Sequence, residues 1–256
     1  MRLIASTLLF VLACGGGDHQ GADDAPTIDA TDALDGSQPD SAPDAPGGLP
    51  LPGFGAISGM CGVLTPTELD GTTPLWFQGQ LDFANDRYDD PAERSQLTPG
   101  GVEIIVDGNA GGSSLYSEVF AFEWLARCEL ATLLKTETEI LYDVDGKKAD
   151  LLVEIDGRKV GVSVTRAVKY PFGQPYSLDE ATPLIERKLD DLQLATTQVA
   201  VADRWATQML AILAFNAQHA QVAMQAWSML DAQTRGSTIL LVVVTEGDAM
   251  FIYTDQ

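Results

Sequence analysis

The amino-acid sequence predicts an α/β fold, in which a mixed central sheet is flanked by helices. Apolar residues recur at helical spacing after Ser114, Thr182 and Asp203, which is typical of helices with one buried face. Between residues 139 and 165, two Asp-Gly pairs separate short apolar runs, a pattern typical of β-hairpins. The run Thr238–Thr245 is apolar on both faces and so resembles a buried central strand. Helices interleaved with such a strand favour a sheet sandwiched between helices.

The core is predicted to follow the order helix, three strands, two helices and a strand. Ser113 or Ser114 can cap the first helix, and Thr182 the second, with Pro183 in its first turn, where a missing N–H costs nothing. The expected elements are, in chain order, a short strand at 102–106, a helix from Ser113 or Ser114 to about 134, strands at 139–144, 149–155 and 159–165, a helix from Thr182 to about 199, a longer helix at 203–231, a strand at 238–245 and a short strand at 250–253.

The first residues are typical of a secretory signal peptide. Arg2 precedes an apolar run that ends at Cys14 and is too short to span a bilayer. The tetrapeptide Val11-Leu12-Ala13-Cys14 resembles the lipobox of bacterial lipoproteins. That resemblance implies removal of residues 1–13, acyl chains such as palmitate on Cys14, and attachment of the chain to the bacterial cell envelope, at the outer membrane or the periplasmic face. The alternative is a cytosolic protein with an apolar first strand.

The rest of the chain divides into three parts by composition. Residues 14–53 are mostly Gly, Asp, Ala, Pro, Ser and Thr, which predicts a disordered acidic tether behind the lipidated cysteine. Residues 54–101 show no clear periodicity and are expected to be an irregular segment that packs onto the core. Residues 102–256 carry the periodic patterns and form the expected folded domain. The membrane, through the predicted lipid anchor, is the expected partner, and the sequence does not identify a protein or ligand partner.

Charge and cysteine content restrict the function classes. The formal net charge of −22 argues against a nucleic-acid binder, which needs basic surface to displace counterions from phosphates. If Cys14 carries lipid, the two remaining cysteines, Cys61 and Cys128, are an even pair in an oxidising compartment, where they could form a disulfide. Two separate thiols remain the alternative.

One stretch resembles a known family. Asp150-Leu-Leu-Val-Glu-Ile-Asp-Gly-Arg-Lys-Val-Gly-Val-Ser-Val-Thr165 is similar to the central hairpin of the PD-(D/E)xK nuclease-like superfamily. The family's core is a helix, three strands, a helix and a strand, the order found in restriction endonucleases. The resemblance extends over about residues 114–245. It implies that Asp150 matches the family's strand aspartate and that Glu118 or Glu123 matches a helix glutamate of some members.

The departure from the family lies in the third strand. Where the family has Glu-x-Lys, this chain has Ser163-Val164-Thr165, so one ligand carboxylate and the positive charge are missing. Mg²⁺ usually needs one or two carboxylates with water and phosphate, so Asp150 with one helix glutamate could hold it only weakly. Plainer interpretations are a turn pair between Asp150 and Lys147 or Lys148, and solvated helix glutamates.

These observations favour a binding or structural role over catalysis. The expected protein is an envelope lipoprotein with a catalytically degenerate nuclease-like domain that has no cofactor and does not bind nucleic acid. The vestigial site residues are Asp150, Glu118, Glu123, Ser163 and Thr165. The alternative is a metal-dependent nuclease with a rearranged site, in which Mg²⁺ is the cofactor and Asp150 a ligand.

Overall fold

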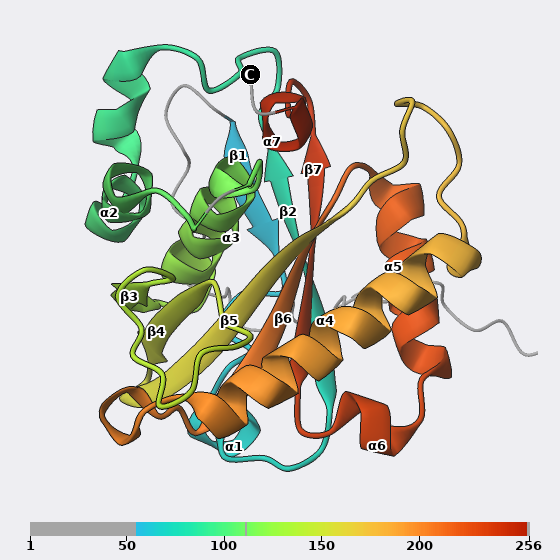
Figure 1. Ribbon diagram of the computed structural model, residues 1–256. Helices are drawn as coiled ribbons and strands as arrows, with labels where there is room; N and C mark the ends of the chain where they lie inside the picture. The colour runs from blue at the N-terminus through green and yellow to red at the C-terminus, as the bar shows by residue number, and fades with distance from the viewer. Residues whose placement is uncertain (1–54, 111, 255–256) are drawn as a thin grey trace, which may run out of the picture. The chain divides into compact units, whose positions relative to one another are not determined.

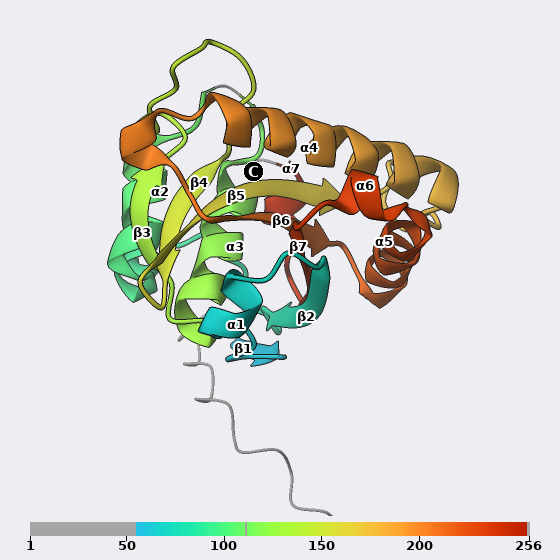
Figure 2. The same ribbon diagram turned by 90° about the horizontal axis from the view of Figure 1, so that it is seen from below.

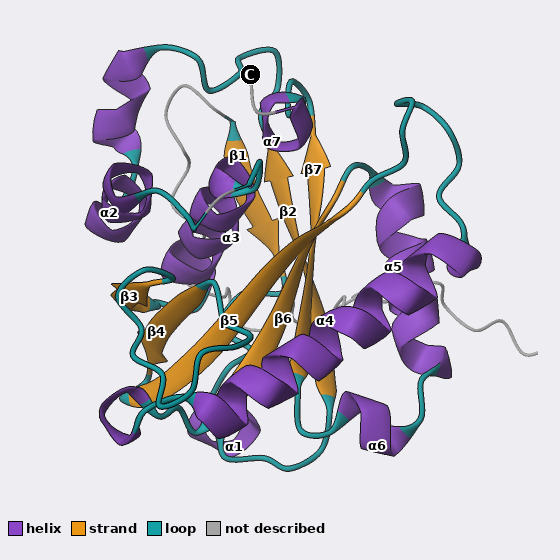
Figure 3. Cartoon of the chain, viewed as in Figure 1, coloured by secondary structure: helices purple, strands orange, loops and turns teal. Residues whose placement is uncertain are grey.

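The computed structural model describes residues 55–110 and 112–254, which form a seven-stranded mixed sheet with helices on both faces (Figures 1 and 3). The predicted α/β class with a helix-flanked mixed sheet is therefore confirmed. The strands are β1 (Ala56–Gly59), β2 (Leu75–Asp82), β3 (Thr132–Thr136), β4 (Leu151–Ile155), β5 (Arg158–Ala167), β6 (Thr207–Ala214) and β7 (Ile239–Glu246). The helices are α1 (Pro66–Leu69), α2 (Pro99–Asp107), α3 (Leu115–Cys128), α4 (Leu178–Gln198), α5 (Ala217–Met229), α6 (Ala232–Arg235) and α7 (Phe251–Thr254), with 3₁₀ turns η1 (Pro91–Gln96) and η2 (Val201–Asp203).

The strand order in the sheet is β1-β2-β7-β6-β5-β4-β3. Strands β2, β7, β6 and β5 are parallel to one another, and each pairing is in register over at least six residues. β3, β4 and β5 form an antiparallel meander, and β1 adds an antiparallel edge to β2. β5 therefore belongs both to the meander and to the group of parallel strands. The candidate site described below lies beside β5.

Two apolar layers hold the helices to the sheet (Figure 2). On one face, α3 contributes Phe120 and Trp124 to a core with alternate residues of β2, β4, β5, β6 and β7. On the other, α4 and α5 cover β6 and β7, with Leu189 and Trp227 among the buried side chains. The strands β6 and β7 are buried on both sides, as parallel strands between helix layers must be.

The predicted long helix at 203–231 is wrong. This stretch contains β6, a turn and α5, and every residue of Thr207–Ala214 is buried. Met, Leu, Ala and Gln are good helix formers, but burial between two helix layers overrides a weak local preference. Asn216 caps α5 by accepting a hydrogen bond from the His219 N–H. The observed order is consequently helix, three strands, helix, strand, helix, strand.

Two short predicted strands are helices instead. Residues 102–106 lie in α2, which Thr98 caps by accepting a hydrogen bond from Gly101 N–H at 3.2 Å, with Pro99 in the first turn. Of the branched apolar residues that indicated a strand, Ile104 is buried in this helix, Val102 and Ile105 are partly buried, and Val106 is exposed. Residues 250–253 lie largely in the short helix α7, which is buried among aromatic rings.

Three boundaries also differ from those predicted. α3 ends at Cys128, before Leu130 with its positive φ of 55°, rather than near residue 134. The strand expected at 139–144 lies earlier, at β3, and of residues 139–144 only Tyr142 forms a β-bridge, with Val199. α4 begins at Leu178 rather than after Thr182, because Ser177 and Glu180 form a capping box, and Pro183 lies inside the helix instead of in its first turn.

Residues 55–101, expected to be irregular, supply two strands to the sheet. β2 lies between β1 and β7, and its Phe77 and Leu81 are buried in the α3 core. Gly79 of β2 faces the Trp124 ring so closely that an added Cβ would lie 2.2 Å from it. The segment therefore belongs to the same core as residues 102–254.

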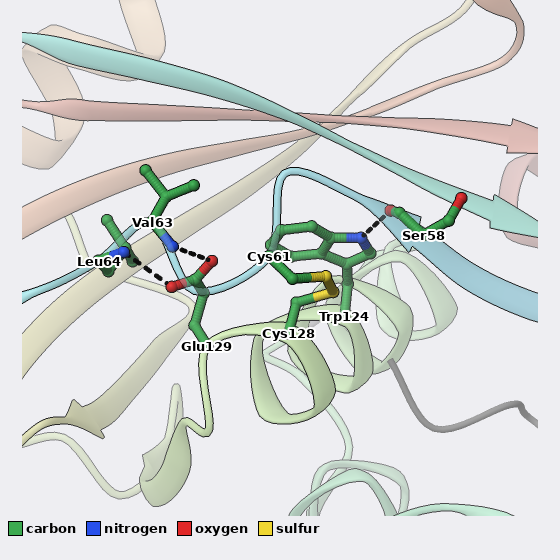
Figure 4. Close-up of a disulfide and its surroundings, with 7 residues drawn as sticks. All are labelled: Ser58, Cys61, Val63, Leu64, Trp124, Cys128 and Glu129. Carbon is green, nitrogen blue, oxygen red and sulfur yellow. Dashed lines mark hydrogen bonds between the residues drawn. A yellow bond between two sulfur atoms is a disulfide. The ribbon is translucent and has the colours of Figure 1, made fainter. Parts of the chain in front are cut away.

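A clamp joins the end of β1 and the residues after it, 58–64, to the C-terminal part of α3 (Figure 4). Cys61 and Cys128 are bonded, with 2.04 Å between their sulfur atoms. The Glu129 carboxylate accepts hydrogen bonds from the N–H groups of Val63 and Leu64, at 3.2 and 2.8 Å. The Trp124 indole N–H donates to the Ser58 carbonyl at 3.2 Å. A disulfide, two hydrogen bonds to a carboxylate and one hydrogen bond from an indole N–H thus hold this edge segment to α3 and the residue after it.

Among the described residues, no helix combines the length and the apolar character that crossing a bilayer requires. The predicted signal peptide, Cys14 and the predicted tether lie outside the described residues.

Candidate functional site

Asp150 and Glu118 interact across two elements that are far apart in sequence. Glu118 lies in the first turn of α3, and Asp150 immediately precedes β4. After burial, the negative charge of Asp150 is the next cause that raises the pKa of Glu118. Two of the residues that the sequence resemblance selected are therefore coupled electrostatically in the structure.

Asp150 is held by the neighbouring strand β5. Its Oδ2 accepts a hydrogen bond from the Ser163 hydroxyl at 3.0 Å and another from the Val164 N–H. Its own N–H donates to the Val162 carbonyl, which continues the β4–β5 ladder. Burial raises the pKa of Asp150, and the positive charge of Lys188 and the hydrogen bonds from Val164 and Ser163 oppose that rise.

Glu118 is almost completely buried, with 2% of its surface exposed. Its Oε1 accepts hydrogen bonds from the Ser114 hydroxyl at 2.7 Å and from the Asn109 side-chain amide at 3.2 Å. Burial and, next, the charge of Asp150 raise the pKa of Glu118 to about 7. Near neutral pH this carboxyl group is therefore close to half protonated, which is typical of functional carboxylate pairs and also of buried structural ones.

Two further charged residues act on Asp150. The positive charge of Lys188, on α4, lowers the pKa of Asp150. Glu137, in the connection between β3 and β4, raises it, and its Oε2 accepts the Ala110 N–H at 3.0 Å. The site therefore combines Glu118 of α3, Glu137 and Asp150 of the β3–β4 connection, and Lys188 of α4.

Glu123, the other candidate glutamate, is not part of this site. Its Oε1 accepts hydrogen bonds from the Thr98 N–H and hydroxyl, at 2.8 and 2.6 Å, and its Oε2 pairs with Arg127 at 2.9 Å. Glu118 and Glu123 are five residues apart, which places them on different sides of α3. Glu123 thus fixes the start of α2 to α3.

Three other basic residues near the hairpin have different partners. Lys147 pairs with Asp191 at 3.1 Å, so the expected turn pair between Asp150 and Lys147 is wrong. Lys169 pairs with Glu180, and Arg166 donates to the Ser113 and Ile252 carbonyls. Thr165 lies in β5 two residues beyond Ser163, so both are on one face of the strand, as expected.

Sequence reasoning missed Lys188, Asn109 and Glu137. Lys188 lies three residues after Ile185 and four before Leu192, beside the stripe that α4 turns toward the sheet. That spacing is a signal that could have selected it. Asn109 and Glu137 lie in connections, where no periodicity indicates which way a side chain points.

Asp150 and Glu118 are carboxylates, the ligand type that a hard cation prefers. Mg²⁺ in proteins is commonly bound through one or two carboxylates and keeps several waters. A second acidic group, Glu103, Asp107 and Glu139, has its carboxylate oxygens within 4.8 Å of one another but is exposed. In it, Asp107 accepts a hydrogen bond from the Thr136 hydroxyl at 2.9 Å.

Comparison with known proteins identifies one similar sequence. Over 152 residues the chain is 34% identical to the AAC-rich mRNA clone AAC4 protein of Dictyostelium discoideum. The match covers 57% of this chain but 22% of that protein, so the chain spans about a fifth of its relative's length. The chain matches no family model, and no solved structure matches it.

Proposed function

We propose that residues 55–254 form a catalytically degenerate nuclease-like domain, which serves an envelope lipoprotein as a binding or structural module. The elements α3, β3, β4, β5, α4 and β6 follow one another as helix, three strands, helix and strand, and β6 is parallel to β5. This succession supports the resemblance to the PD-(D/E)xK core more closely than the expected order with two consecutive helices did.

One observation carries the degenerate interpretation. Ser163 takes the place of the family's glutamate and uses its hydroxyl to hold Asp150 rather than to add a ligand. Thr165 takes the place of the lysine and carries no charge. A single well-placed electrostatic group is worth roughly 3–4 kcal/mol in a transition state, so two such losses predict an inactive site.

A second candidate function, a metal-dependent nuclease with a rearranged site, is favoured by Lys188. This lysine acts on Asp150 from α4 and could bring the positive charge that β5 lacks. A bound Mg²⁺ would supply Lewis-acid activation of water or phosphate. Asp150 and Glu118 would hold it, and Ser163 and Val164 would orient Asp150.

Metal titration calorimetry with Mg²⁺ and Mn²⁺, together with cleavage of DNA and RNA, separates the two candidates. The degenerate interpretation predicts no cleavage by the natural chain. It also predicts that Ser163→Glu with Thr165→Lys gains metal binding, whereas the neutral control Ser163→Gln with Thr165→Met does not. Circular dichroism checks that both variants fold.

The nuclease candidate predicts the opposite result. The natural chain would then cleave, and both Asp150→Asn and Lys188→Met would abolish cleavage, while Lys147→Met, which removes an exposed lysine, would leave it unchanged. Cleavage with this pattern overturns the degenerate interpretation. If the restored variant folds but binds no metal, the nuclease-like assignment of the core loses its support.

The proposed localisation to the cell envelope rests on Val11-Leu12-Ala13-Cys14 and on the acidic composition of the residues that follow. Several acyl chains hold a protein firmly to a membrane, whereas one holds it marginally. Cys14→Ser should therefore move the protein from the membrane fraction to the soluble fraction of a bacterial host. Unchanged fractionation of this variant would refute the lipid anchor without bearing on the domain.

A further inference from the structure

A cavity of about 230 Å³ lies between η1, α2 and the start of α3. None of the residues of the Asp150 site lines it. Its lining residues are Tyr88, Asp89, Asp90, Pro91, Arg94, Ile105 and Tyr116. Its volume is below the roughly 300–1,000 Å³ of pockets for drug-sized ligands, so it suits a molecule with one ring.

Aromatic rings form one wall of the cavity. The ring centroids of Tyr88 and Tyr116 lie 5.8 Å apart, and the two ring planes are inclined at 63°. The ring centroids of Tyr88 and Phe120 lie 5.5 Å apart. The Phe251 ring packs against both tyrosines, with centroid distances of 6.1 Å to Tyr88 and 5.6 Å to Tyr116. This packed cluster holds the two lining tyrosines in place, and a rigid ring wall favours a flat ligand surface because aromatic faces and edges pack best against another ring.

The acidic groups at the rim already have partners. Asp89 pairs with Arg87 at 3.4 Å, Asp90 caps η1, and Glu93 accepts the N–H groups of Asp89 and Asp90 at 2.8 Å each. The Arg94 guanidinium, by contrast, makes no hydrogen bond or ion pair within residues 55–110 and 112–254. An unpaired cation at a cavity is notable in a protein with 15 basic and 37 acidic residues.

Arg94 lines the same cavity as Tyr88 and Tyr116. Burial raises the pKa of Tyr88, and the positive charge of Arg94 opposes this rise. A guanidinium matches the two oxygens of a carboxylate with a pair of parallel N–H groups. Asp89 and Asp90 on the same rim would repel a doubly charged phosphate more strongly than a singly charged carboxylate.

We propose that this cavity binds a small planar monocarboxylate, with its ring against Tyr88 and Tyr116 and its carboxylate on Arg94. The inference is independent of the function of the Asp150 site, because the two share no residue.

The test is ligand-observed saturation-transfer NMR with the purified chain. Benzoate is the probe, benzylamine carries the same ring with the opposite charge, and acetate carries the charge without the ring. We expect benzoate to bind with a millimolar or lower dissociation constant, at least tenfold more tightly than either control. Arg94→Gln should weaken benzoate binding at least tenfold, and Arg187→Gln, which changes an exposed arginine of α4, should not alter it.

Three results would overturn the proposal. They are no benzoate binding at millimolar concentration, benzylamine binding as strongly as benzoate, or benzoate binding that Arg94→Gln leaves unchanged. Since the Arg94 guanidinium has no hydrogen-bond or ion-pair partner in the described part of the chain, its substitution should leave the far-ultraviolet circular dichroism spectrum unaltered, which keeps the comparison valid.

Discussion

The Ser163 hydroxyl donates a hydrogen bond to Asp150 across the β4–β5 hairpin, with 3.0 Å between Oγ and Oδ2. The two residues are thirteen positions apart, and the antiparallel register brings them together, because Leu151 pairs with Val162. Through this bond, a position that would carry a metal ligand in the nuclease-like family becomes a support for the neighbouring aspartate.

Removing this support should change the protonation of Asp150. Ser163→Ala deletes one donor to the carboxylate, so the pKa of Asp150, already raised by burial, should rise further. The variant should also lose about 1–3 kcal/mol of folding free energy, the range for a hydrogen bond to a charged group. Carboxyl ¹³C NMR titration and urea unfolding measure the two effects. An unchanged Asp150 titration would contradict the prediction; Ser163→Thr, which keeps a hydroxyl, is the control.

Glu118 should make stability depend on pH. Its pKa in the folded state, about 7, lies above the ordinary 4.5, so its stabilising contribution is complete below pH 4.5 and is lost as pH rises through 7. The loss for this buried group is about 3 kcal/mol by linkage, an order-of-magnitude figure. Urea unfolding at pH 5 and pH 8 should show a smaller difference for Glu118→Gln than for the natural chain. Glu186→Gln, an exposed change, should keep the natural difference.

The Cys61–Cys128 disulfide should contribute substantially to stability. It links residues 67 positions apart, and the chain-entropy relation gives about 4 kcal/mol for a loop of that length. The double variant Cys61→Ser with Cys128→Ser should therefore unfold at clearly lower urea concentration than the oxidised chain. A reductant should lower the midpoint of the natural chain and leave that of the variant unchanged. Equal midpoints for the oxidised chain and the variant would refute the contribution.

The buried pair of Arg127 and Glu123 should matter more than an exposed pair. Arg127→Met leaves the fully buried Glu123 carboxylate with only its Thr98 donors, which should cost about 3–5 kcal/mol. Lys147→Met breaks the more exposed pair with Asp191 and should cost about 0–1 kcal/mol. Comparable losses in urea unfolding would show that burial does not decide the difference.

Local signals in the sequence were sufficient for several elements. The Asp156-Gly157 pair predicts the turn between β4 and β5, and the structure confirms it. Asp and Gly tolerate positive φ, and both residues adopt it here. The strand β7 was evident from its uninterrupted apolar run. The resemblance to the nuclease-like family indicates Asp150 and one of two helix glutamates. Of these two, Glu118 is coupled to Asp150, whereas Glu123 binds Thr98 and Arg127.

The α/β class, the hairpin and the helices with one apolar face can be predicted from the sequence alone, since these depend on residues close in the chain. That Thr207–Ala214 is a strand depends on tertiary packing, because burial between two helix layers outweighs its helical preference. Tertiary packing also places β2 beside β7, although the two strands are 157 or more residues apart in sequence. The effect of the Lys188 charge on the pKa of Asp150 likewise depends on where α4 packs on the sheet, which no local pattern specifies.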